Sequence, residues 1–145
     1  MIMPEKLYIS WEDFHQHTKA LAAKIKASGE YDKIIAVSRG GLVPAGIISY
    51  ELNIRNTQAI NISSYDGDKQ RDSSAIEVEC ADFKSDKKTL IIDDLSDTGQ
   101  TFCLLRKMFP LATLASVYAK PQGAKYVDIY AEDLPDAWLV FPWDI

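Results

Sequence analysis

Two adjacent carboxylates and a small polar loop follow a short apolar run near the middle of the chain. The run at residues 89–92 leads into Asp93 and Asp94, and after Leu95 comes a loop made of Ser96, Asp97, Thr98, Gly99, Gln100 and Thr101. Backbone N–H groups at the start of a helix, with hydroxyl groups beside them, can bind a phosphate. Neighbouring carboxylates accept hydrogen bonds from a ribose diol and supply oxygen ligands to Mg²⁺. The segment therefore indicates a site for a sugar phosphate and a metal ion.

The residue after the loop glycine indicates which class of phosphate compound the loop could bind. Gln100, and not a lysine, comes after Gly99, which makes a nucleoside triphosphatase loop a poor match and favours a phosphate monoester. The alternative for Asp93 and Asp94 taken alone is an ordinary strand-to-helix turn with an acidic cap. The twelve-residue context of residues 90–101 weighs against that alternative.

Alternating strands and helices must position this loop. The periodicity predicts helices over residues 11–27, 42–52 and from Gly99 or Gln100 to residue 109, and strands over residues 34–37, 59–62, 89–92 and 114–119. Because the strands are apolar on both faces, we expect an α/β fold with a central, mostly parallel sheet flanked by helices. Ligands of such sheets bind at the carboxyl ends of the strands, where the polar loop is expected.

Two segments depart from this alternation within what we interpret as a single domain over residues 1–145. Residues 63–88 are rich in Ser, Asp, Lys and Gly, and polar insertions of this length are typical of a flexible lid over a site or of a disordered loop. Residues 120–145 are rich in aromatic residues and proline, which favours a small irregular C-terminal hood over one end of the sheet.

Composition excludes several classes of function. The 145 residues are 47% hydrophobic and 26% charged, as in a globular domain with a sizeable core, and the net charge of -5 argues against a general nucleic-acid or anionic-membrane surface. Cys80 and Cys103 lack the spacing of a zinc site or a disulfide framework, which suits a reduced, cytoplasmic protein. No leader or membrane-spanning stretch is expected.

The segment 90–101 resembles the signature of the type I phosphoribosyltransferases, in which an aliphatic strand, two acidic residues and two variable positions precede D-T-G-x-T. Ser-Arg-Gly-Gly-Leu-Val-Pro at residues 38–44, Ala-Lys-Pro at 119–121 and Pro-Trp-Asp at 142–144 extend the resemblance, which is greatest to the bacterial xanthine-guanine phosphoribosyltransferases. The resemblance implies the type I phosphoribosyltransferase fold and a transfer of phosphoribose from phosphoribosyl pyrophosphate (PRPP) to a purine.

The resemblance also implies roles at the PRPP end of the site. The loop 96–101 would hold the 5-phosphate, Asp93 and Asp94 would orient the ribose, and Asp94 would bind Mg²⁺. Arg39 and Gly40, which follow a peptide bond that is often cis in this family, would bind the pyrophosphate together with Arg71 of the lid. Ser64 and Tyr65 would enter the site when the lid closes.

At the purine end, the resemblance assigns Asp97 as the catalytic residue, with its carboxylate hydrogen-bonded to N7 of the base; a mere helix cap is the alternative. Lys120 would donate to the 6-oxo group, Trp138 would stack on the ring, and the backbone at Leu139 and Asp144 would face the 2-substituent. Without the family, Trp138 would be interpreted as core and Lys120 as a surface charge. Guanine or xanthine, and hypoxanthine more weakly, would give GMP, XMP or IMP and pyrophosphate.

Two other functions stay open from the sequence: an enzyme that prefers hypoxanthine, and a non-catalytic regulator that senses PRPP. The acidic balance and the presence of Asp97 and Lys120 weigh against the regulator. The resemblance further implies a homodimer or homotetramer in the cytoplasm, with peripheral association at the inner membrane left open, and no nucleic-acid partner.

Overall fold

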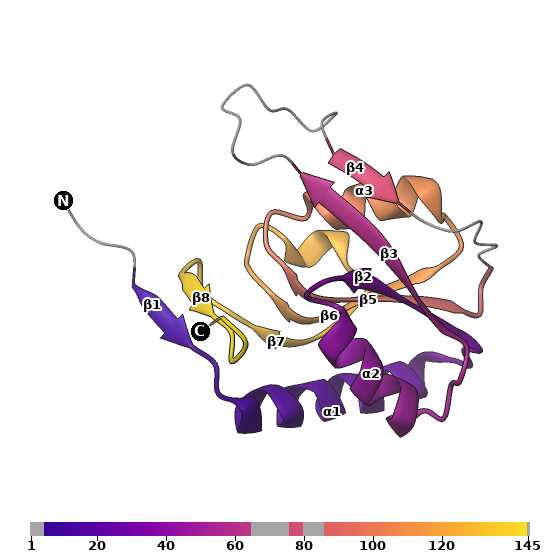
Figure 1. Ribbon diagram of the computed structural model, residues 1–145, viewed down its shortest axis with the longest axis horizontal. Coiled ribbons are helices and arrows are strands. Elements are labelled where there is room, and N and C mark those ends of the chain that lie inside the picture. The colour runs from indigo at the N-terminus through magenta and orange to yellow at the C-terminus, as the bar shows by residue number, and fades with distance from the viewer. Residues whose placement is uncertain (1–4, 65–75, 80–85, 145) are drawn as a thin grey trace.

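A six-stranded sheet in the order β4-β3-β2-β5-β6-β7 forms the centre of the computed structural model, which describes residues 5–64, 76–79 and 86–144 (Figure 1). All neighbouring strands are parallel except β3 and β4. The mostly parallel α/β sheet that the sequence predicts is thereby confirmed. The strands are β2 (Lys33–Ser38), β3 (Thr57–Ser64), β4 (Ile76–Glu79), β5 (Thr89–Ser96), β6 (Thr113–Ala119) and β7 (Ile129–Asp133).

Helices cover both faces of this sheet, as the doubly apolar strands require. Helices α1 (Trp11–Ser28) and α2 (Leu42–Glu51) lie on one face and α3 (Gln100–Met108) on the other (Figure 1). Alternate residues of β2 divide between the two layers, because Ile34 packs with α1 and α2 whereas Ile35 packs with α3. Within the described residues, no helix is both long and apolar enough to span a bilayer.

The predicted site elements converge at the carboxyl ends of β2 and β5. The two strands are parallel neighbours, with Ala36 beside Ile92, so the turn after β2 and the acidic pair of β5 share one edge. β5 extends further than the apolar run indicates, since ladder pairing with β6 continues from Asp93 to Ser96. Ladder pairing holds these last residues in the strand, and Leu95 also packs against the hydrophobic core.

The predicted hood and lid both contain regular structure that sequence periodicity did not reveal. Residues 129–133 form β7, a parallel edge strand of the main sheet, so the prediction of an irregular hood over all of 120–145 is wrong there. Beyond it, β8 (Trp138–Val140) pairs in parallel with β1 (Lys6–Tyr8) as a separate two-stranded sheet. Within the segment 63–88, residues 76–79 form β4 antiparallel to β3, with Ile62 opposite Val78.

Aromatic packing anchors the end of the chain to the start of α1. The rings of Phe141 and Trp143 stack with centroids 4.8 Å apart, and Trp143 meets Phe14 edge-on at 5.0 Å. Phe14 and Phe141 are buried. Burying such large rings is worth several kcal/mol, roughly 1.5–3 for each, which fixes β8 relative to the main sheet.

Candidate active site

The phosphate loop turns sharply at Gly99, directly before α3. Gly99 has a φ of 89°, in the left-handed region that favours glycine, and a Cβ there would lie 2.0 Å from Cδ2 of Tyr126. The Thr98 hydroxyl accepts a hydrogen bond from the Gln100 N–H at 3.3 Å. Residues 95–102 line a small cavity of about 80 Å³ at this turn. A tight concavity at a helix N-terminus is suited to a phosphate.

Ser96 has a different role from the one predicted. Its side chain is buried, and the hydroxyl donates to the Gly123 carbonyl at 2.7 Å. The Ser96 carbonyl in turn accepts the Lys120 N–H at 3.0 Å. The prediction that the Ser96 hydroxyl stands beside the phosphate is therefore wrong, because that group ties the loop to the segment after β6.

The acidic pair adjoins the glycine turn that follows β2. A Cβ on Gly40 would clash with the Asp94 carboxylate, so a larger residue here would have to displace that side chain. Asp93 Oδ1 accepts the Asp94 N–H at 2.8 Å. The Ser38–Arg39 peptide bond is cis, and the Arg39 side chain is exposed at this edge. The structure thus brings Arg39, Gly40 and the acidic pair together.

The electrostatics of the pair suit a hard cation. Burial, followed by the charge of Asp94, raises the pKa of Asp93 well above its ordinary range, and burial also raises the pKa of Asp94. A cation beside them would compensate both charges. Within the described ranges, no cluster of three or more His, Cys, Asp or Glu could hold a metal. Two adjacent carboxylates fit Mg²⁺, which binds through one or two carboxylates and completes its shell with water and substrate phosphates.

The raised pKa values predict a pH-dependent stability. A carboxyl whose pKa is higher in the folded than in the unfolded state favours folding below the unfolded value, near 3.8. This contribution is lost as the pH rises through the folded value. We expect Asp93→Asn, which keeps the acceptor oxygen, to raise the Tm of the ligand-free protein at pH 8 by about 2–4 °C and to flatten its rise on acidification.

Differential scanning calorimetry between pH 5 and 8 measures this effect. Glu30→Gln removes an exposed carboxylate far from the site and serves as the control, with an unchanged pH profile. A Tm of Asp93→Asn at or below that of the wild type at pH 8 would contradict the assignment of uncompensated charge to the pair.

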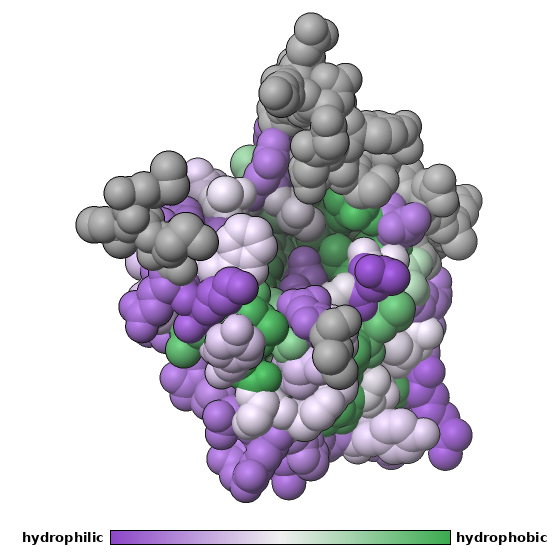
Figure 2. Space-filling model, turned by 60° about the vertical axis from the view of Figure 1, so that its left-hand side comes forward, coloured by the Kyte–Doolittle hydropathy of each residue, from purple (hydrophilic) through white to green (hydrophobic). Residues whose placement is uncertain are grey.

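A larger pocket of about 770 Å³ lies beside the phosphate loop, on the side of the molecule that carries β1 and β8. Figure 2 shows this side hollowed, with hydrophilic side chains in the hollow next to hydrophobic ones. Leu95 and Asp97 line both the pocket and the loop cavity, so the two spaces adjoin at Asp97. The other lining residues are Lys6, Tyr8, Lys120, Trp138, Leu139, Val140, Phe141 and Asp144.

All five residues predicted to face the purine line this pocket. The Lys120 side chain is only 10% exposed, and its Nζ lies 3.3 Å from Oδ1 of Asp97. Trp138 is 63% exposed, so a flat face is open to a ligand, and Leu139 follows it on β8. The Asp144 carboxylate accepts the Phe141 N–H at 3.0 Å. The pocket thus combines an aromatic wall with a buried cation and a carboxylate.

Sequence reasoning missed the contribution of β1. Lys6 and Tyr8 reach the pocket because β1 pairs with β8, a contact between the two ends of the chain that short-range periodicity does not report. Of the residues predicted for the lid, Tyr65 and Arg71 lie outside the described residues, and Ser64 ends β3. His17, on α1, is half-buried, with Nδ1 2.9 Å from the Tyr118 hydroxyl.

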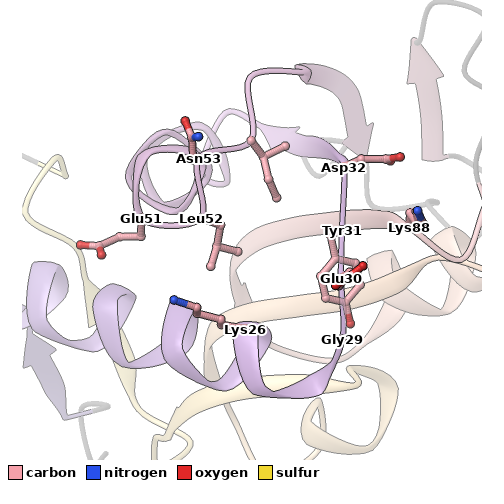
Figure 3. A pocket seen from close by; sticks show the side chains of 10 residues that line it. Lys26, Gly29, Glu30, Tyr31, Asp32, Glu51, Leu52, Asn53 and Lys88 are labelled. Atoms are coloured by element: carbon pink, nitrogen blue, oxygen red, sulfur yellow. The ribbon is translucent and has the colours of Figure 1, made fainter.

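A second hollow, of about 510 Å³, lies at the opposite end of β2 and β5 (Figure 3). Its charged lining residues carry both signs and come from the ends of α1 and α2 and from the loops before β2 and β5: Lys26, Glu30, Asp32, Glu51 and Lys88. None of the predicted site residues lies in this second hollow.

Comparisons with known proteins agree with this geometry. A family model described as "Phosphoribosyl transferase domain" matches residues 9–145. The chain is 44% identical over 141 residues to a xanthine-guanine phosphoribosyltransferase of Idiomarina loihiensis, covering 97% of this chain and 88% of that protein.

Two solved structures share the fold. A purine phosphoribosyltransferase of Pyrococcus horikoshii is 28% identical with a TM-score of 0.80, covering 97% of this chain and 95% of that one. A xanthine-guanine-hypoxanthine phosphoribosyltransferase of Helicobacter pylori, at 24% identity, has the same coverage and a TM-score of 0.75. On the family match and the Idiomarina relative, the chain belongs to the phosphoribosyltransferase family.

Proposed function

We propose that the chain is a xanthine-guanine phosphoribosyltransferase, which transfers phosphoribose from PRPP to guanine or xanthine, and more weakly to hypoxanthine. The observation that carries the proposal is the junction at Asp97, where a phosphate-sized cavity meets a pocket with the Lys120–Asp97 pair and the exposed Trp138. The name of the Idiomarina relative supports the choice of bases.

In the proposed reaction, the bond from ribose C1 to pyrophosphate breaks as a bond to a ring nitrogen of the base forms. The phosphate loop holds the 5-phosphate, and Asp93 orients the ribose hydroxyls. Asp97 accepts the proton that the base must lose or reposition, near N7. Mg²⁺ held by Asp94 and by PRPP oxygens would neutralise charge on the leaving pyrophosphate. Arg39 and the backbone amides around Gly40 would bind the same group.

Base selection follows from the buried ammonium. A 6-oxo group accepts a hydrogen bond from Lys120, whereas the 6-amino group of adenine is itself a donor there and offers this buried cation no acceptor. The aromatic face of Trp138 contacts any purine and adds little discrimination. Recognition of the 2-substituent is proposed to come from the backbone at Leu139 and Asp144.

Pyrophosphate release from PRPP, measured with guanine, xanthine, hypoxanthine and adenine, tests the proposal. We expect turnover with guanine and xanthine that requires Mg²⁺, weaker turnover with hypoxanthine, and a kcat/KM for adenine lower by about 10³-fold or more. A kcat/KM highest for hypoxanthine would favour the hypoxanthine enzyme. Binding of PRPP without turnover of any base would favour the regulator.

A further inference from the structure

A cluster of four polar side chains lies at the edge of the purine pocket and includes two residues without an assigned role. Lys120 Nζ lies 3.3 Å from Oδ1 of Asp97 and 3.8 Å from Oδ1 of Asp136. Gln122 Nε2 lies 3.5 Å from each of the same two oxygens. One ammonium and one amide thus join two carboxylates, of which Asp97 lines the pocket and Asp136 does not.

The ammonium of this cluster is far more buried than its two carboxylates. The Lys120 side chain is 10% exposed, whereas those of Asp97 and Asp136 are 53% and 71% exposed. A cation as enclosed as Lys120 needs a nearby negative charge. In the proposed reaction Asp97 turns to the base and accepts its proton, so its negative charge is no longer available to Lys120. A second carboxylate is then required.

We propose that Asp136 is a positioning residue of the purine site, which holds the Lys120 ammonium in place for the 6-oxo group while Asp97 is engaged with the base. Gln122 assists by fixing the separation of the two carboxylates. This inference rests on the proposed function, because it assigns Lys120 to the 6-oxo group.

Asp136 is also close in the chain to Trp138, the residue proposed to stack on the purine. Asp136 lies in the turn between β7 and β8, closed by a hydrogen bond from the Ala137 N–H to the Pro135 carbonyl at 2.8 Å. Trp138 begins β8 two residues later. The contact between Asp136 and Lys120 therefore links the aromatic wall of the pocket to the cation that recognises the base.

Kinetics of Asp136→Asn test the proposal. We expect the KM for guanine to rise about 3- to 10-fold, with the KM for PRPP and kcat within about twofold of the wild type. Asp136→Glu restores the charge and should bring the KM for guanine back toward the wild-type value. Glu30→Gln, the same loss of charge in the remote hollow of Figure 3, should change none of the three constants.

A double-mutant cycle separates action through Lys120 from a general structural role. In a Lys120→Met background, Asp136→Asn should cause no further loss of affinity for GMP, measured by calorimetry so that the readout does not require turnover. An equal loss in both backgrounds, or an unchanged KM for guanine in the single variant, would overturn the role of Asp136. A wild-type protein that transfers no purine would instead overturn the proposed function itself.

Discussion

Replacing Asp97 with Asn is expected to lower kcat with guanine by about 10²- to 10³-fold, because an amide cannot accept the proton that the carboxylate takes from the base. Asp97 stands where the phosphate loop meets the purine pocket, and half of its side chain is open to a ligand. The substitution preserves shape and leaves the loop backbone unchanged. Calorimetry should therefore give a Kd for PRPP with Mg²⁺ within about twofold of the wild type.

The base 7-deazaguanine, which carries carbon in place of N7, provides the matched control. It should be a poor substrate for the wild type and equally poor for Asp97→Asn, because the contact is already lost. A wild-type rate in Asp97→Asn with guanine would remove Asp97 from the chemistry. A parallel loss of PRPP binding would show that Asp97 supports the loop rather than the proton transfer.

The strand, turn and helix that form the proposed phosphate loop could be predicted from the sequence because their determinants are local. The strand, the acidic pair, the glycine and the following helix lie within residues 89–108, and each is specified by neighbours close in the chain. The apolar β2 and β5 likewise predicted burial between two helical layers. Because β2 and β5 pair in parallel, the turn after β2 brings Gly40 beside Asp94. No additional sequence motif is needed to predict this contact.

The rest of the site depends on contacts between distant residues. Lys6 and Tyr8 enter the pocket only because β1 pairs with β8, and Asp136 meets Lys120 only because β7 joins the sheet beside β6. The Ser96 hydroxyl illustrates the same limit. A serine in this loop could bind a phosphate, but its hydroxyl instead donates a hydrogen bond to the Gly123 carbonyl, 27 residues away. Residue types and their spacing in the sequence do not indicate which of two possible partners such a hydroxyl group binds.

Replacing the loop glycine, Gly99, should weaken PRPP binding for a conformational reason. In Gly99→Ala the new Cβ would enter the Tyr126 ring, and alanine at a φ of 89° adds backbone strain. Because strain of this kind costs on the order of 1–3 kcal/mol, we expect the Kd for PRPP with Mg²⁺ to rise about 10- to 100-fold. Calorimetric titration measures it.

Two companion variants make this result interpretable. Gly46→Ala places a Cβ in open space on α2 and should leave PRPP binding unchanged while stabilising the helix by about 0.5–1 kcal/mol. Tyr126→Ala added to Gly99→Ala removes the steric clash, so PRPP binding should recover in part, and the remaining deficit measures the cost of the left-handed φ. Wild-type binding in Gly99→Ala would mean that PRPP does not depend on this turn, and the 5-phosphate would then have to be held elsewhere on the sheet edge.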